Sequence, residues 1–228
     1  MTITRDVVEL PADERLAEKL RGLDPVGVLA TLLILLAGSP WISAILVLLW
    51  AKLSRTPLKD IGYVRPESWS TSTAIGVVFG AALKLLMKAV VMPLFGADPI
   101  NHAYHYLAGN PAALPGILFA VTIGAGFGEE TVFRGFLFAQ LRKVLGRSVG
   151  ASIAIVMVTS AWFAVVHYPG QGLAGVEQAA VTGLVFGTIF ANTGRIWMLM
   201  VAHAAFDVAA VAIIYWELET HIAHFLFT

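Results

Sequence analysis

Long apolar segments separated by short polar stretches make up most of the chain. They cover Pro25–Trp50 and, approximately, residues 71–95, 113–145, 149–167, 176–191 and 196–216. A helix of about 20 apolar residues can cross a bilayer. The first segment, of roughly 26 residues, would reach about 39 Å, enough for one span but too short for two, so we expect one helix kinked at Pro40. The pattern predicts an all-α polytopic transmembrane helical bundle of about six to eight spans.

Composition agrees with a membrane protein. Hydrophobic residues make up 58% of the chain and charged residues only 13%, whereas a soluble domain carries about 25% charged residues. The 15 basic and 15 acidic residues balance, so no basic field indicates nucleic acid as a partner. The absence of cysteine from the sequence excludes disulfides, thiolate zinc sites and cysteine nucleophiles.

The apolar segments divide the chain into three parts. Residues 1–24 are polar, lack the apolar core of a signal peptide and are expected to form an interfacial or cytosolic tail. Within them, Leu16, Leu20 and Leu23 share one face of a short predicted helix, which lies either at the membrane surface or in solvent. Residues 25–216 form the predicted transmembrane bundle, and 217–228 form a C-terminal tail.

Lysine and arginine are unevenly distributed among the connections. Residues 51–70, 142–148 and 192–195 are basic and are predicted to be cytoplasmic, while 97–112 and 168–175 are predicted to lie outside. This alternation fits six spans, but it places the N-terminal tail outside despite its four basic residues. We expect an integral, multi-pass protein of the plasma (inner) membrane.

Two pairs of polar residues stand apart from the main motifs. Lys84 and Lys88 lie one helical turn apart in an apolar segment, and we favour snorkelling to the interface over a position in a polar interior. His102 and His105 lie in a connection without a third nearby ligand, so we favour a solvated loop over a metal pair.

The stretch Gly128-Glu129-Glu130-Thr131-Val132-Phe133-Arg134-Gly135 places three ionisable groups in an apolar environment. Charges at that depth are costly, so they indicate a functional site or a deliberately paired cluster. Glu130 and Arg134 can neutralise each other at i, i+4, which leaves Glu129, about 100° round the helix, as the unpaired acid. Gly124, Gly126 and Gly128 precede the acids and permit close helix contacts or a bend, so a tilted or broken helix is expected.

Two later segments repeat the same spacing, with Phe163 and His167 on one and His203 and Asp207 on the other. A carboxylate in a low-dielectric pocket can act as a base toward water, a histidine can share the proton transfer, and a second histidine can stabilise an oxyanion. These residues therefore favour hydrolysis. Zinc held by Glu129, His167 and His203 is the alternative, although the sequence has no H-E-x-x-H motif.

The order Glu129-Glu130-x-x-x-Arg134, Phe163-x-x-x-His167 and His203-x-x-x-Asp207 resembles the CPBP (Abi) family of intramembrane proteases over about residues 110–215. That family includes CAAX prenyl endopeptidases and bacteriocin-processing or self-immunity proteins. The resemblance implies an all-helical membrane protease with its site inside the bundle. By similarity, Glu129 and His167 would activate water, His203 and Asp207 would stabilise the oxyanion, and Arg134 would hold Glu130, with Phe163 in support.

The resemblance also sets the expected partners, which are membrane lipid and a peptide or protein substrate that is membrane-associated or prenylated. It favours a glutamate-dependent reaction without a cofactor, with zinc as the alternative. Asp207 departs from the family pattern, where asparagine often stands. An aspartate can orient His203 by accepting its N–H, but when ionised it cannot donate a hydrogen bond to an oxyanion as an amide does.

Two other functions stay open at this stage. One is a non-catalytic membrane immunity or scaffold protein that keeps the charges for packing. The other is a transporter with Glu129 as a proton relay, which the lack of an inverted repeat disfavours.

Overall fold

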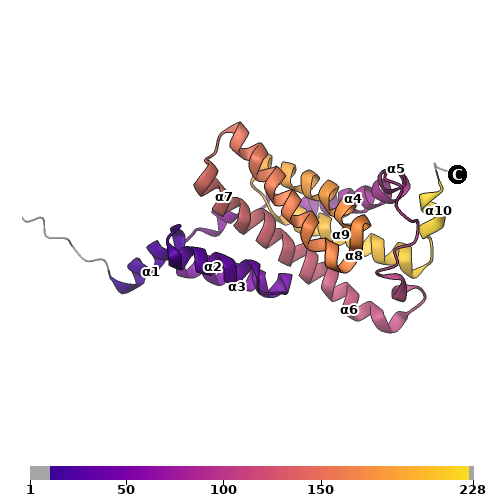
Figure 1. The fold of residues 1–228 in the computed structure, drawn as a ribbon, viewed down its shortest axis with the longest axis horizontal. Helices are drawn as coiled ribbons and strands as arrows, with labels where there is room; N and C mark the ends of the chain where they lie inside the picture. The colour runs from indigo at the N-terminus through magenta and orange to yellow at the C-terminus, as the bar shows by residue number, and fades with distance from the viewer. Residues whose placement is uncertain (1–10, 226–228) are drawn as a thin grey trace, which may run out of the picture.

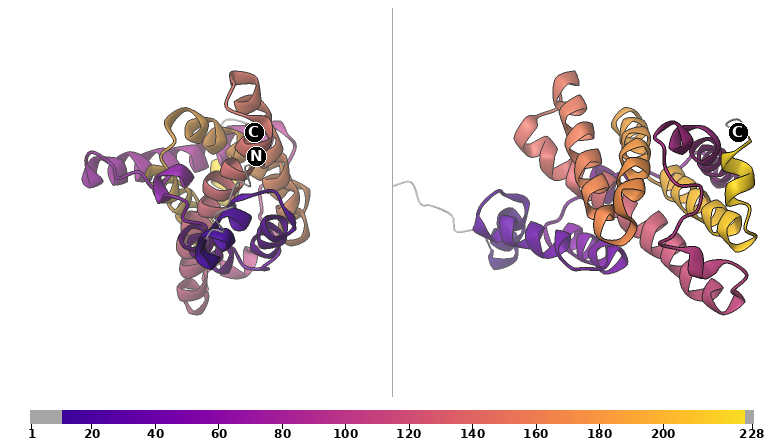
Figure 2. Two further views of the ribbon diagram at one scale, coloured as in Figure 1. Left: turned by 90° about the vertical axis from the view of Figure 1, so that its left-hand side faces the viewer. Right: turned by 45° about the vertical axis from the view of Figure 1, so that its right-hand side comes forward.

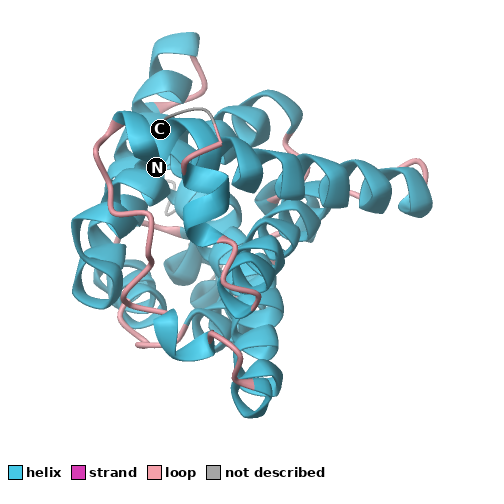
Figure 3. Cartoon of the chain, turned by 90° about the vertical axis from the view of Figure 1, so that its right-hand side faces the viewer, coloured by secondary structure: helices cyan, strands magenta, loops and turns pink. Residues whose placement is uncertain are grey.

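The computed structural model describes residues 11–225, and this part of the chain is helical without strands (Figures 1 and 3). The α-helices are α1 Ala12–Arg21, α2 Pro25–Leu35, α3 Pro40–Leu53, α4 Trp69–Leu86, α5 Met92–Leu94, α6 Leu114–Phe119, α7 Phe138–Leu145, α8 Val149–Thr193, α9 Trp197–Tyr215 and α10 Glu219–Ala223. Short 3₁₀ turns cover Leu58–Ile61, His105–Leu107 and Pro111–Ala113, and π-helical turns cover Met87–Val91 and Ala120–Leu137. The predicted all-α fold is confirmed.

Local chemistry sets where several helices begin. The side chains of Asp24, Ser68 and Ser148 each accept a hydrogen bond from the backbone N–H three residues on, at 3.0, 3.3 and 3.1 Å respectively. Such caps satisfy N–H groups that have no partner within the helix. At the far end of α8, Gly194 takes the left-handed conformation (φ 62°) that ends a helix and favours glycine.

Within residues 11–225, four helical stretches are long and apolar enough to cross a membrane: 69–94, 111–145, 149–193 and 197–215. Large hydrophobic side chains point outward from them, including Val78, Val158 and Val165, which are 69%, 51% and 64% exposed. Exposed apolar side chains on helices of this length are expected to contact lipid, so the chain is an integral membrane protein.

The third of these stretches, α8, reverses direction at Gly172, where φ is 63°. A Cβ on Gly183 would lie 3.1 Å from Ser160, and one on Gly187 would lie 3.4 Å from Val156. Gly183 therefore faces Ser160, while Gly187, later in the chain, faces the earlier residue Val156. This pairing shows that the two halves of α8 are antiparallel. The separate segments predicted over 149–167 and 176–191 are therefore the two arms of α8.

The single kinked span predicted over Pro25–Trp50 is wrong. Helices α2 and α3 form a hairpin and lie side by side (Figures 1 and 2), with Gly38 in the turn at φ 75°. Trp50 Nε1 donates to the Leu20 carbonyl at 2.9 Å, and Arg21 donates to the Ser54 carbonyl at 2.7 Å, so the two ends of the segment are neighbours. With 11 and 14 residues, each arm reaches only about 15–21 Å, less than a bilayer core. The two short arms of this hairpin, and the two antiparallel arms of α8 counted as one stretch, account for the difference between four long stretches and the six predicted segments.

The hairpin also corrects the predicted side of the N-terminal tail. Helix α1 lies at the same end of the molecule as the basic connection after α3, because Arg55 pairs with Asp13 and with Glu14. Lys143 donates to the Arg21 carbonyl at that end. The described part of the tail therefore lies on the predicted cytoplasmic side, in agreement with its basic residues. Residues 1–10 lie outside the described part.

The predicted leucine face of the N-terminal helix is only partly buried. Leu20 is 8% exposed and packs in a core cluster with Val47 and Trp50 of α3, whereas Leu16 and Leu23 are 44% and 58% exposed. Helix α1 is therefore packed against the hairpin through Leu20.

The closest helix packing joins α4 to α9, which carries His203. A Cβ on Gly76 would lie 2.9 Å from the Met198 carbonyl oxygen, and one on Gly80 would lie 2.0 Å from that of Ala202. Small residues at i and i+4 let two backbones approach within a membrane. These two glycines set how deeply α9 sits against α4.

Candidate active site

Glu130 and Arg134 form the buried ion pair that their spacing predicts. Arg134 Nη1 donates to Glu130 Oε1 at 3.0 Å, and the two side chains are 2% and 0% exposed. The guanidinium also lies 4.6 Å from the ring centre of Phe163. The central helix thus holds a charged pair in the protein interior, where such a pair persists only with good geometry and additional contacts.

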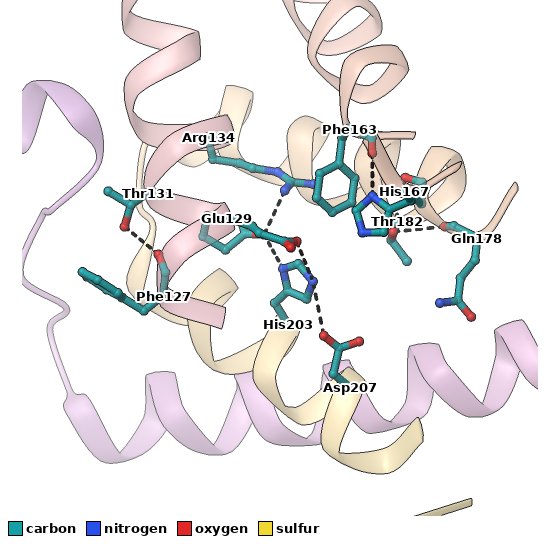
Figure 4. Close-up of polar contacts among 12 residues, drawn as sticks. Phe127, Glu129, Thr131, Arg134, Phe163, His167, Gln178, Thr182, His203 and Asp207 are labelled. Atoms are coloured by element: carbon teal, nitrogen blue, oxygen red, sulfur yellow. Dashed lines mark hydrogen bonds and ion pairs between the residues drawn. The ribbon is translucent and has the colours of Figure 1, made fainter. Parts of the chain in front are cut away.

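His203 is oriented by Glu130, in contrast to the prediction. Its Nδ1 donates to Glu130 Oε1 at 2.7 Å, while Asp207, the predicted orienting partner, has Oδ2 at 3.7 Å from Nε2 (Figure 4). Asp207 lies one turn further along α9 and reaches the other nitrogen, whereas Glu130 approaches from the facing helix. Because an ionised carboxylate only accepts, Nδ1 of His203 carries a proton.

Glu129 is the acid without a strong partner, as predicted. Its Oε2 lies 3.7 Å from His203 Nε2, beyond hydrogen-bond length. This oxygen is buried and has no hydrogen-bond partner among the described residues. The Glu129 side chain is 16% exposed, so the carboxylate borders the cavity described below.

His167 is held by its own helix. Its Nδ1 lies 2.6 Å from the carbonyl oxygen of Phe163, one turn earlier on α8. Since a carbonyl only accepts, Nδ1 donates, and Nε2 of the neutral ring is left as an acceptor. The Phe163 ring lies 4.6 Å from the His167 ring and 6.0 Å from the His203 ring, so it separates and positions the two histidines.

The four predicted catalytic side chains meet at one cavity of about 380 Å³. The cavity is lined by Glu129 from the central helix, His167 from α8, and His203 and Asp207 from α9. Figure 4 shows these side chains converging from three helices. The structure therefore brings the whole predicted set together, although it records no direct contact between Glu129 and His167.

His203 and Glu129 lie at the same depth in the bundle because of where α9 begins. Counted from the predicted cytoplasmic ends of the apolar segments, His203 would lie shallower than Glu129, yet the two side chains are in contact. Ile196, just before α9, is completely buried, and its N–H donates to the Gly62 carbonyl at 3.0 Å. Helix α9 therefore begins inside the protein, beneath the connection that contains Gly62, which moves His203 to the level of Glu129.

The glycines before the acids have two different roles. A Cβ on Gly126 would lie 2.9 Å from Ala204, and one on Gly128 would lie 2.7 Å from Pro40, so both permit the predicted close contacts. Gly124 has no atom within 4 Å of its Cβ position and borders the cavity. The central helix is widened into π turns over Ala120–Leu137 but is not broken; such turns are frequent at functional sites.

The snorkelling prediction for the two lysines is wrong. Lys84 is 6% exposed, and its Nζ donates to Gln178 Oε1 at 2.8 Å inside the bundle. Lys88 pairs with Glu219 of α10 at 3.2 Å and also donates to the Pro99 carbonyl. The stripe that carries both lysines faces α8 and α10, which helical spacing alone does not reveal.

The tip of the α2–α3 hairpin contributes an unpredicted part of the cavity wall. Ser39, Pro40 and Trp41 line it, and the Trp41 ring meets that of Phe119 edge-on at 6.5 Å. The Gly38-Ser39-Pro40 interruption was the available signal, but it indicated a kink and gave no partner for the turn.

The predicted zinc set is not arranged as a metal site. Among residues 11–225, no group of three or more His, Cys, Asp and Glu side chains could hold a metal ion. The metal dependence of the reaction stays a prediction.

His102 and His105 belong to the exposed connection between α5 and α6. His102 Nε2 lies 3.0 Å from Asp98 Oδ2, and both side chains are more than half exposed. The hydrogen bond from His102 lowers the pKa of the Asp98 carboxyl. His105 is also exposed, so the loop is solvated, as favoured.

These features define an all-helical integral membrane protein with a buried carboxylate–histidine site. Residues 111–209 match the family model described as type II CAAX prenyl endopeptidase Rce1-like. The matched segment covers less than half of the chain and contains all three motifs, so over these residues the chain is similar to the family that the motifs resemble. No curated protein and no solved structure matches the chain. The family that this segment resembles is described as a prenyl endopeptidase.

Proposed function

We propose that the chain is an intramembrane endopeptidase in which Glu129 and His167 activate water to hydrolyse a peptide bond. The observation that carries this proposal is the convergence of Glu129, His167, His203 and Asp207 from three helices on one cavity. In a chain with so few intramembrane charges, packing alone does not account for four polar side chains that line the same space.

Glu129 is suited to act as the general base. Its buried Oε2 has no hydrogen-bond partner among the described residues, so a water molecule in the cavity can donate to it. His167 offers an acceptor nitrogen on the same cavity. A water held by these two groups has the polar partners that an ordered buried water requires.

Hydrolysis then proceeds by addition of water to the peptide carbonyl and loss of the amine. The water oxygen bonds to the substrate carbonyl carbon while its proton passes to Glu129, and the carbonyl oxygen becomes an oxyanion. His203, doubly protonated, donates from Nε2 to that oxygen while Glu130 accepts from Nδ1. The C–N bond breaks as the leaving nitrogen takes the proton from Glu129. Asp207, near the same Nε2, favours the positively charged ring.

The remaining walls support a membrane-associated substrate. Trp41, Ile117, Phe119 and Val121 add apolar surface to the cavity, which would accept an apolar substrate segment. A prenylated CAAX-type peptide is the first class to test, because the matched family is described by that substrate.

The experiment is cleavage of quenched-fluorescent peptides, prenylated and plain, by the purified protein in detergent. Glu129→Gln should lower turnover by about 10²–10⁴-fold, the usual contribution of a general base. Glu67→Gln is the matched control, because that side chain is 91% exposed and its variant should keep full activity.

Adding a zinc chelator to the same assay distinguishes the glutamate-dependent reaction from the zinc-dependent one. Activity that is lost in Glu129→Gln but survives the chelator supports the glutamate-dependent reaction, while loss under the chelator would support zinc. Turnover of Glu129→Gln at the wild-type rate would refute the proposed base and favour the non-catalytic scaffold.

A further inference from the structure

A second cavity adjoins the catalytic one. It encloses about 170 Å³ and lies between α4, α8, α9, α10 and the connection after α5. Six residues line both cavities: Lys84, Asn101, Gln171, Gln178, Ala210 and Ile214. Four of these six are polar, and they lie outside the motifs that predicted the catalytic site. A polar wall therefore joins the two cavities.

Lys84 is the charged residue of this polar wall, and its burial inside the bundle requires an explanation. It is 6% exposed, at a position where an isolated ammonium is costly. Its contacts are with neutral groups: the Gln178 amide oxygen at 2.8 Å and the face of Phe206 at 4.9 Å. Among the described residues, it forms no ion pair with a carboxylate, although Asp207 and Glu219 line the two cavities.

The neighbouring lysine, in contrast, forms an ion pair. Lys88, one turn further along the helix, is neutralised by Glu219, which is almost fully buried and also accepts from the Asn101 N–H at 2.9 Å. Arg134 is likewise neutralised by Glu130. Lys84 is thus the lysine on these cavity walls that has no direct ion pair among the described residues, although Asp207 and Glu219 are close enough to attract it electrostatically.

The groups around Lys84 present donors. A lysine has donors only, and because Gln178 Oε1 accepts from Lys84, the Gln178 amide nitrogen keeps its two N–H groups for another partner. An ammonium beside an amide N–H₂ suits an anionic acceptor with two oxygens, and hydrogen bonds to ionised groups are the strong ones.

We propose that Lys84 and Gln178 form a carboxylate-binding subsite that holds an acidic group of the substrate peptide. The carboxylate comes either from the free C-terminus of the peptide or from an aspartate or glutamate side chain near the scissile bond. The inference rests on the proposed function, which places the scissile bond at Glu129. Lys84 and Glu129 line the same cavity, so one bound peptide can reach both.

The test measures binding, so that it does not depend on turnover. Fluorescently labelled peptides of one core sequence are titrated with the detergent-solubilised Glu129→Gln protein, and Kd is read from anisotropy. One peptide ends in a free acid and one in an amide. Two further amidated peptides carry either glutamate or glutamine at the same position, which separates the two sources of the carboxylate.

We expect one acidic peptide to bind about tenfold more tightly than its neutral counterpart. Lys84→Met should abolish that preference and Lys84→Arg should retain it. Lys59→Met, a change at an exposed lysine, is the matched control and should preserve the preference. Equal Kd values for acidic and neutral peptides would overturn the proposal, as would a preference that persists in folded Lys84→Met.

Cleavage by the protein with Glu129 intact distinguishes this inference from the proposed function. Carboxylate-dependent binding without cleavage of any peptide would refute the protease and leave the subsite standing. Cleavage with the same KM for acidic and neutral peptides would refute the subsite and leave the protease standing. If Lys84 acted only as a structural charge, Lys84→Met would change kcat equally for all peptides, and this result also counts against the subsite.

Discussion

Removal of Arg134 tests whether the buried charges are balanced as the structure indicates. In Arg134→Met, Glu130 keeps its position at 0% exposure but retains only the hydrogen bond from His203 to Oε1, since Oε2 has no partner among the described residues. Breaking a buried pair in this way costs roughly 3–5 kcal/mol. The lost contact between the guanidinium and Phe163 adds about 0.5–2 kcal/mol.

The assay is thermal unfolding in detergent, followed by circular dichroism. For a chain of this length, 1 kcal/mol corresponds to about 2–4 °C in Tm, so the loss of the pair predicts a decrease of roughly 6–20 °C. Arg147→Met, at an exposed arginine, is the matched control and should leave Tm unchanged.

A double variant distinguishes the cost of the orphaned carboxylate from the loss of the arginine side chain. Replacing both charges, in Glu130→Gln with Arg134→Met, removes the orphaned carboxylate while the glutamine oxygen can still accept from His203. Neutral replacement of a whole buried pair is often tolerated, so the double variant should be more stable than Arg134→Met alone. A single variant with wild-type Tm, or a double variant less stable than the single one, would refute the reasoning.

Two further predictions concern the scaffold. Gly80→Ala should lower the unfolding free energy by about 1–3 kcal/mol, because its Cβ would lie 2.0 Å from the Ala202 carbonyl oxygen. Gly124→Ala, whose Cβ would have no atom within 4 Å, is the control. Equal Tm values for the two variants would contradict the tight α4–α9 contact. The hairpin predicts that a cysteine placed at Glu18 and one at Tyr106 react with an impermeant thiol reagent from opposite sides of the membrane, measured in oriented vesicles. The native sequence has no cysteine and supplies the unlabelled control; labelling of both sites from one side would refute the placement of α1.

The site residues could be predicted because their signals are local. Glu130 and Arg134 are four residues apart on one helix, so spacing alone gave the ion pair that the structure contains. The cost of burying charge then identified Glu129, His167, His203 and Asp207 as residues that need a reason to be inside the bundle. The structure places them at one cavity, while their catalytic roles await the variants above.

Partners far apart in the sequence could not be predicted. The turn at Gly38 and an internal kink give the same apolar pattern, and only the contacts of Leu20 with Trp50 and of Arg21 with Ser54 show that the chain reverses. The depth of His203 likewise depended on the connection that covers Ile196.

By itself the sequence determined the class of protein, the helical segments and the polar residues of the site, because burial cost and helical spacing act on residues close together in the chain. Only the tertiary structure decided which groups meet. Glu130, and not Asp207, orients His203, Lys84 turns inward to Gln178, and Glu219 neutralises Lys88. Each of these contacts joins different helices, and the rotation and depth of one helix against another follow from close packing at residues such as Gly80, which a one-dimensional pattern does not encode.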